Sequence, residues 1–184
     1  MPIYISLLRG INVGGSKIVL MDDLKKAFEK SGFSEVETYI QSGNVIFISE
    51  KKTMSELEGL IKAAIKSKFD FDVGILVLEL DELQEIIRKN PFGKDKLRAG
   101  EKIYFTILSE KPSKDKIAEL HKTKSPVDDF EIINKTVYVF CRKGYTKSPF
   151  NNNSVEKVLR VNGTTRNLET MKKLVEIGKA IERT

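Results

Sequence analysis

The chain of 184 residues is long enough for one domain or two small ones, because domains run from about 50 to 250 residues. Its hydrophobic content of 40% is ordinary to slightly low for a globular protein, and its charged content of 32% is somewhat high. No apolar run approaches the roughly 20 residues that cross a bilayer, and no basic leader precedes the first apolar stretch, so we expect no membrane segment. The single cysteine, Cys141, excludes an internal disulfide and indicates a reducing compartment, which predicts a cytoplasmic protein.

The net charge of +6 is unevenly distributed along the chain. Residues 1–140 hold 22 Lys/Arg and 22 Asp/Glu, whereas residues 141–184 hold 10 Lys/Arg and only 4 Asp/Glu. A localised positive charge attracts phosphates, nucleic acids or acidic partners. The alternative is a solvated helical face with scattered lysines.

The first half of the sequence follows the order β-α-β-β-α-β. Its predicted elements are a strand at 3–8, a helix at 21–28, strands at 35–40 and 45–48, a helix opened by the capping box Thr53-x-x-Glu56, and a strand at 73–78. The turn between the two central strands is Gln41-Ser42-Gly43-Asn44, a good hairpin signal. This order is the ferredoxin-like pattern.

The second half repeats much of this order. We predict a short helix capped by Asp81, a polar linker at 93–100, a strand at 102–108, a helix at 113–122, a hairpin of 130–133 with 136–141, a helix capped by Ser154, and a terminal helix carrying Leu168 to Ile181. No fourth strand is predicted, and the halves show no obvious residue identity. We therefore predict an α+β fold of two ferredoxin-like halves that arose by internal duplication, with an extra C-terminal helix. The predicted divisions are 1–80 (with the glycine-rich loop), 81–100 (helix and linker) and 101–184 (with basic C-terminal helices).

A glycine-rich loop follows the first predicted strand and is the leading site candidate. Gly10-x-x-x-x-Gly15-Ser16-Lys17 comes close to the phosphate-loop pattern, but Ser and Lys are reversed and residues 18–20 read as extended, so we do not assign a Walker motif. A looser role in binding an anion or a polar ligand fits exposed N–H groups beside cations. The alternative is a tight connection that needs glycine for positive φ.

Two later segments are also rich in hydrogen-bond donors. Thr164-Thr165-Arg166-Asn167 precedes the terminal helix, where Arg166 could hold an anion at the helix start or pair with an internal acid. The segment 142–153 contains Tyr145 and Phe150, which could stack on a base or anchor the loop, and anchoring is favoured for Phe150.

Other chemistry has little support in the sequence. His121 is the only histidine and Cys141 the only cysteine, so no Cys/His metal site is predicted. Cys141 ends an apolar strand and is expected in the core. An RNA-recognition module would need a set of aromatics on the third strand, where residues 45–49 offer only one.

Three segments resemble hallmark motifs of the bacterial "domain of unknown function 1697" family: Leu8 to Gly15, Thr38 to Phe47, and Thr165-Arg166-Asn167. The resemblance covers nearly the whole chain. It implies a cytoplasmic protein of two ferredoxin-like halves and no established activity, cofactor or substrate. By resemblance it nominates Arg9, Asn12, Gln41, Ser42, Asn44, Arg166 and Asn167.

The leading hypothesis is a binding module for an anionic or polar small ligand, with a nucleotide among the candidates. Its predicted site combines the loop at 9–17, the hairpin turn at 41–44 and the segment 164–167. The predicted ligand-binding residues are Arg9, Asn12, Gly14, Gly15, Lys17, Gln41, Ser42, Asn44, Arg142, Tyr145, Lys147, Thr165, Arg166 and Asn167. The alternatives are nucleic-acid binding by the basic segment 141–184, and an enzyme that acts by positioning and electrostatics. The sequence indicates no particular cofactor.

Overall fold

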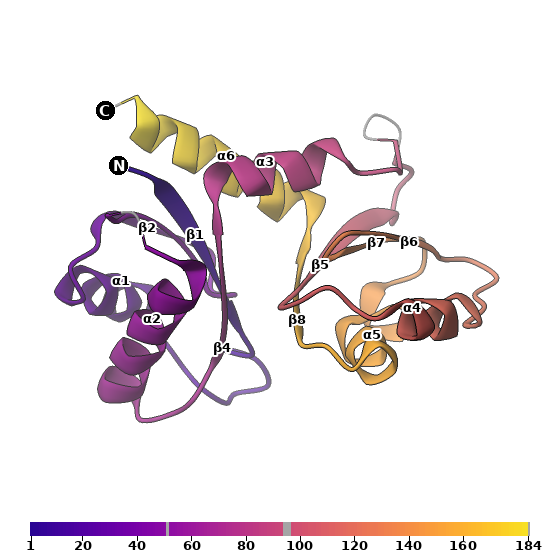
Figure 1. Cartoon of the computed structure of the whole chain (residues 1–184), viewed down its shortest axis with the longest axis horizontal. Helices are drawn as coiled ribbons and strands as arrows, with labels where there is room; N and C mark the ends of the chain where they lie inside the picture. The colour runs from indigo at the N-terminus through magenta and orange to yellow at the C-terminus, as the bar shows by residue number, and fades with distance from the viewer. Residues whose placement is uncertain (51, 94–96, 184) are drawn as a thin grey trace. The chain divides into compact units, whose positions relative to one another are not determined.

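The chain forms two compact units, each built around its own antiparallel sheet (Figure 1). The computed structural model describes residues 1–50, 52–93 and 97–183. The first unit comprises Met1–Glu85 and the chain from Lys172 onward, and the second comprises Ile86–Met171. Residues 94–96 of the predicted linker lie outside the described part of the chain. None of the helices in that part is long and apolar enough to cross a membrane.

The first unit has the predicted β-α-β-β-α-β order. Its elements are β1 (Ile3–Arg9), α1 (Met21–Lys30), β2 (Ser34–Tyr39), β3 (Asn44–Ile48), α2 (Met54–Phe69) and β4 (Gly74–Glu79), followed by α3 (Leu80–Arg88). The strand order β2-β3-β1-β4 is that of a ferredoxin-like sheet. Helices α1 and α2 lie together on one face of this sheet (Figure 1).

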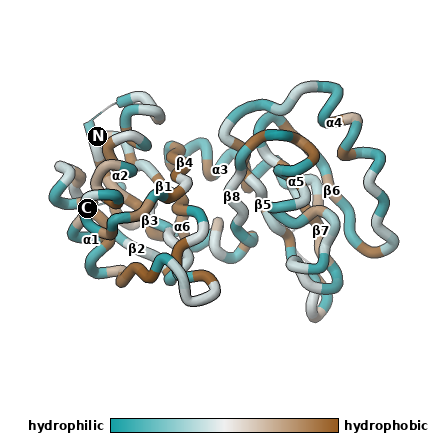
Figure 2. Tube along the Cα trace, turned by 90° about the horizontal axis from the view of Figure 1, so that it is seen from below, coloured by the Kyte–Doolittle hydropathy of each residue, from teal (hydrophilic) through white to brown (hydrophobic). Residues whose placement is uncertain are grey.

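The core of the first unit is centred on an aromatic side chain of β3. The Phe47 ring lies 4.5 Å from Phe33, 5.5 Å from Phe28 and 5.7 Å from Tyr4, measured between centroids. All four side chains are buried. Hydrophobic colour is concentrated in strands such as β1 and β4 in Figure 2, as expected for a sheet that is covered by helices.

The second unit repeats the fold and supplies the strand that the sequence analysis missed. Its elements are β5 (Lys102–Leu108), α4 (Lys114–His121), β6 (Asp129–Ile133), β7 (Thr136–Cys141), the 3₁₀ turn η1 (Tyr145–Lys147), α5 (Asn152–Leu159) and β8 (Gly163–Asn167), followed by α6 (Leu168–Glu182). The strand order β6-β7-β5-β8 is equivalent to that of the first sheet. The prediction of no fourth strand is therefore wrong. Strand β8 lacks the apolar alternation by which strands are predicted. Its Thr165 lies opposite Thr106 of β5, and the two side chains pair through their hydroxyl groups.

Helix starts depend on which polar side chain reaches the free N–H groups. The capping box of Thr53 and Glu56 is confirmed. Helix α5 starts two residues before Ser154, because the Asn151 side chain accepts from the Ser154 N–H at 3.0 Å, so the predicted cap is wrong. Helix α3 begins at Leu80, which places Asp81 in its first turn rather than at its cap. Asn167 caps α6, accepting from the Thr170 N–H at 2.8 Å.

The structural equivalence of β1 and β5 exposes a residue match between the halves. Ile3-Tyr4-x-Ser6-x-Leu8 corresponds to Ile103-Tyr104-x-Thr106-x-Leu108. Ser6 pairs with Val45 and Thr106 with Val137, and the N–H groups of Leu8 and Leu108 each donate over 2.8 Å to the turn of the neighbouring hairpin. The duplication is therefore visible in residues as well as in topology.

Candidate functional site

The glycine-rich loop and the β2–β3 turn meet at the end of β1, and we name residues 9–17 with 41–44 the loop–turn site. The Asn12 side chain joins them. Its Nδ2 donates to the carbonyl oxygens of Val19 and Gln41, both at 2.9 Å, and its Oδ1 accepts from the Val19 N–H at 2.8 Å. Asn12 adopts φ +54°, a conformation that asparagine tolerates better than most residues. Its amide is thus used to hold the loop on the turn.

The tip of the loop presents backbone donors to solvent. The Ser16 N–H and hydroxyl both donate to the Val13 carbonyl, at 3.2 and 3.0 Å, which closes a tight turn. Gly14 and Gly15 form this turn with φ +60° and +75° and are exposed. Their N–H groups make no hydrogen bond within the described part of the chain.

Of the other predicted residues of this site, some are held by hydrogen bonds to the backbone and others are exposed. Asn44 is buried, and its Nδ2 donates to the Tyr39 carbonyl and the Ser42 hydroxyl, both at 2.9 Å. Gln41 and Ser42 are exposed, and Arg9 is half-buried at the end of β1. Lys17 donates to the Asp72 carbonyl at 2.6 Å and lies over the Phe71 ring. Its charge is therefore held by a carbonyl rather than by a carboxylate.

A second polar group lies within the second unit, where the 142–153 segment meets β5 and β8. The Tyr145 hydroxyl donates to the Thr165 hydroxyl at 3.0 Å, and Thr165 donates to the Asn152 amide oxygen at 2.9 Å. Since Thr165 has only one proton, the 2.7 Å contact with Thr106 must be a donation from Thr106. The Tyr145 ring stacks on Tyr104 with centroids 4.1 Å apart. Sequence reasoning missed Tyr104 and Thr106, although their alternate positions put them on one face of the strand.

Tyr145 gives this network a measurable pH dependence. Burial raises the pKa of its phenol, against the hydrogen bonds with Thr165 and Thr106, which lower it. In the unfolded chain the phenol ionises near its ordinary pKa of about 10, so the stability from the buried neutral phenol is present below that pH and is lost above it. Tyr145→Phe should cost about 0.5–1.5 kcal/mol at pH 7. We expect the difference in free energy of unfolding between wild type and Tyr145→Phe to shrink above about pH 10. Urea unfolding at pH 7, 9 and 11 measures it. A constant difference would contradict this role.

Three other predicted ligand-binding residues of the second unit, Arg142, Lys147 and Arg166, take no part in the hydroxyl network of Tyr145, Thr165 and Thr106. Arg142 is held by an ion pair with Asp129 at 2.9 Å, a hydrogen bond to the Val127 carbonyl and contact with the Phe140 ring. Lys147 is exposed. Arg166 is half-buried and donates to the Thr165 carbonyl at 2.9 Å. Burial lowers the pKa of Arg166 to about 10, which leaves it cationic at neutral pH.

Positive charge is concentrated in the second unit. Residues 86–171 contain 18 Lys/Arg and 10 Asp/Glu, a net charge of +8, whereas the rest of the chain contains 14 Lys/Arg and 16 Asp/Glu, a net charge of −2. The basic segment 141–184 is divided between the units, because residues from Lys172 onward belong to the first.

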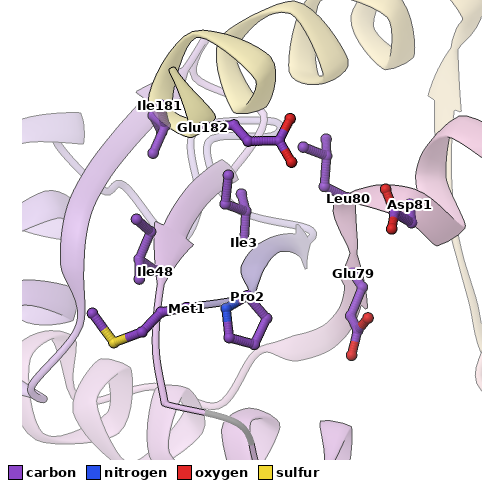
Figure 3. Close-up of a pocket in the computed structure, with 9 residues that line it drawn as sticks. All are labelled: Met1, Pro2, Ile3, Ile48, Glu79, Leu80, Asp81, Ile181 and Glu182. Carbon is purple, nitrogen blue, oxygen red and sulfur yellow. The ribbon is translucent and has the colours of Figure 1, made fainter. Parts of the chain in front are cut away.

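A pocket of about 330 Å³ opens in the first unit at the start of β1 (Figure 3). Apolar side chains of Ile3, Ile48 and Ile181 form one side, and the carboxylates of Glu79, Asp81 and Glu182 lie on the other. Sequence reasoning missed this pocket because its walls come from the ends of elements that are far apart in the chain. In the described ranges, no group of His, Cys, Asp and Glu side chains is arranged to hold a metal ion.

Cys141 and His121, the only cysteine and the only histidine in the sequence, are the candidates for a nucleophile and a general base. Cys141 is buried in the core of the second unit, as expected, and burial raises the pKa of its thiol, which disfavours a reactive thiolate. The exposed His121 ring packs beside Phe130, with centroids 5.0 Å apart. Phe150 is buried against Phe130 and anchors its loop, also as expected.

Comparison with known proteins identifies relatives without an assigned activity. Residues 1–138 match the model of a family described as "Protein of unknown function (DUF1697)". No curated protein matches the chain. Among solved structures, the chain is similar to "conserved bacterial protein SP0830 from Streptococcus pneumoniae", with 22% identity, a TM-score of 0.74, and coverage of 96% of this chain and 98% of that one. At this identity the likeness shows the fold alone.

Proposed function

The chain belongs to the DUF1697 family of proteins of unknown function, and we propose that it is a module that binds an anionic or polar small ligand at the loop–turn site. A nucleotide is among the candidate ligands. Gly14 and Gly15 would donate their N–H groups to the ligand, while Gln41 would orient a polar group and Lys17 would supply positive charge.

The observation that carries this proposal is the attachment of the loop to the turn by Asn12. The Asn12 side chain exchanges two hydrogen bonds with the Val19 backbone, which close the loop, and donates one to the Gln41 carbonyl, which attaches the loop to the turn. A preformed site binds more tightly because less conformational freedom is lost on association. Unpaired N–H groups in a glycine turn, with a nearby cation, suit an anion. The larger predicted site, which also includes residues 164–167, stays a hypothesis.

Nucleic-acid binding is the second candidate, and the net charge of +8 in residues 86–171 favours it. Phosphate contacts made by lysine and arginine release counterions, so such binding weakens steeply with salt. The candidate region is the second unit as a whole rather than the segment 141–184 alone.

The thermal midpoint of the protein, measured with a panel of ligands at two salt concentrations, distinguishes small-ligand binding from nucleic-acid binding. The panel contains nucleotides, sugar phosphates, polyamines, aminoglycosides and short oligonucleotides. A ligand at 100 times its Kd adds about 2.7 kcal/mol, which is roughly 5–10 °C for a chain of this size. We expect a salt-tolerant shift with one class of small anion. An oligonucleotide shift that disappears at higher salt would assign the function to the second unit.

Two variants locate the small-ligand site. Gln41→Ala and Lys17→Gln should each reduce the shift at a fixed ligand concentration, whereas Gln84→Ala on α3 should leave it unchanged. Gln84 is a matched control because its amide also lies in the first unit and bonds only to Asp81 among the described side chains. A full shift in both site variants would reject the loop–turn site.

A further inference from the structure

A second hollow in the first unit is a groove of about 320 Å³ between α1 and α2. Its walls are short side chains, Ala27 and Ser31 at the end of α1 and Ala64 and Ser67 on α2. Such small residues leave space between the two helices. Three lysines surround this space: Lys26, Lys30 and Lys68. The groove shares no residue with the loop–turn site.

The charge of the groove differs from that of the unit that contains it. The first unit has a net charge of −2, yet no acidic side chain lines the groove. Lys26 and Lys30 are exposed and make no ion pair within the described ranges. Lys68 lies 3.5 Å from Asp23, in a partly exposed pair of the kind that contributes little to stability. The ammonium groups of Lys26 and Lys30 are thus available to a ligand, and that of Lys68 would have to exchange Asp23 for the ligand.

The last carbonyls of α1 find hydrogen-bond donors without the lysines, although Lys30 in the last turn also interacts favourably with the helix dipole. The carbonyl of Ala27 accepts from the Ser31 hydroxyl at 2.9 Å, and that of Glu29 accepts from the Gly32 N–H at 3.0 Å. The Phe28 carbonyl accepts from the Ser31 N–H at 2.9 Å. Lys26 and Lys30 are also four residues apart on the same helix face, a spacing at which like charges repel. An anion in the groove would relieve this repulsion.

We propose that the α1–α2 groove binds an oligophosphate, either an inorganic chain or the phosphate chain of a nucleotide. Three cations around one space favour a ligand that carries several negative charges over a single carboxylate. The Ser67 hydroxyl can donate to a phosphate oxygen. The absence of aromatic residues from the lining means that recognition depends on phosphate rather than on a base.

The test is isothermal titration calorimetry of the full chain with inorganic tripolyphosphate, ATP, orthophosphate and adenosine. Tripolyphosphate should bind in low salt and should bind more tightly than orthophosphate, and adenosine should not bind. ATP binding equal to or weaker than that of tripolyphosphate would identify an inorganic chain as sufficient. Tighter ATP binding would show that the nucleoside makes contacts beyond the lining of the groove and would identify a nucleotide. Failure of both oligophosphates to bind at millimolar concentration would overturn the proposal.

Variants connect this binding to the groove. Lys26→Gln should raise the Kd for tripolyphosphate by about fivefold or more, because a charge-assisted contact is lost. Lys62→Gln should change it by less than about twofold, since Lys62 is an exposed α2 lysine outside the groove with the same charge. Ala64→Leu should fill the groove and abolish binding without changing the charge, with the thermal midpoint as a check on folding.

The outcomes also separate this groove from the loop–turn site. Tripolyphosphate binding that is lost in Lys26→Gln but kept in Lys17→Gln supports the groove, whatever the fate of the loop–turn proposal. Equal effects of Lys26→Gln and Lys62→Gln would show a diffuse charge effect and reject the groove. Undiminished binding by a folded Ala64→Leu protein would reject it as well.

Discussion

Phe47→Ala is expected to lower the free energy of unfolding by about 3–5 kcal/mol, the largest effect of any single substitution considered for this protein. The Phe47 side chain is fully buried, and its ring contacts those of Tyr4, Phe28 and Phe33. Truncation removes the burial of the ring and leaves a cavity between the sheet and α1. A loss of this size should lower the thermal midpoint by about 6–20 °C.

Phe71→Ala is the matched control for this substitution. Phe71 is only partly buried, and it stacks on Phe69 at the edge of the same core. Its truncation should cost about 1–2 kcal/mol, since less apolar area is lost and solvent can fill the space. Equal losses in the two variants, measured by urea unfolding, would contradict a core centred on Phe47.

Gly43→Ala is expected to destabilise the protein by roughly 2–4 kcal/mol, for two reasons that can be separated. Gly43 adopts φ +78°, which an L-residue with a Cβ atom adopts only at a cost. A Cβ at this position would also lie 2.7 Å from Leu8 Cβ and 2.8 Å from Ile11 Cδ1. Neither neighbour can move freely, because both side chains are buried and the Leu8 N–H is bonded to the Gly43 carbonyl.

Gly10→Ala isolates the backbone contribution. Gly10 has a similar φ of +71°, but a Cβ there would meet no atom within 4 Å. Its substitution should cost only about 1–2 kcal/mol, the price of the left-handed conformation. The two variants would be compared in the same denaturant titration. If Gly43→Ala were no worse than Gly10→Ala, the close approach of the turn to β1 would have no energetic weight.

Most strands and helices of this fold could be predicted because their apolar residues repeat with the period of the element. The strand β8 could not, because Thr164 and Thr165 give it no apolar alternation. Its pairing with β5 depends on hydroxyl groups that only meet after folding. The start of α5 was misplaced for a similar reason, since both Asn151 and Ser154 can cap a helix and only the structure shows which does.

The candidate sites were predictable to different degrees. The glycine loop and the Gln41–Asn44 turn were both identified from their residues. The structure brings them together through Asn12, whose partners lie 7 and 29 positions away and leave no local signal. The α1–α2 groove could not have been found. Its alanines, serines and lysines read as an ordinary solvated face until two helices are placed side by side.

The return of the chain to the first unit at Lys172 has a consequence for synthesis on the ribosome. The sheet of the first unit emerges early, but Gly178 and Ile181 of α6 are translated only after the whole second unit. Gly178 lies so close to Leu80 that a Cβ would be 2.7 Å from the Leu80 side chain, so this junction is tightly packed. Since synthesis proceeds at roughly 5–20 residues per second, α6 is completed on the order of 5–20 s after the rest of the first unit. During that interval Leu80 lacks the packing contact that Gly178 of α6 later provides.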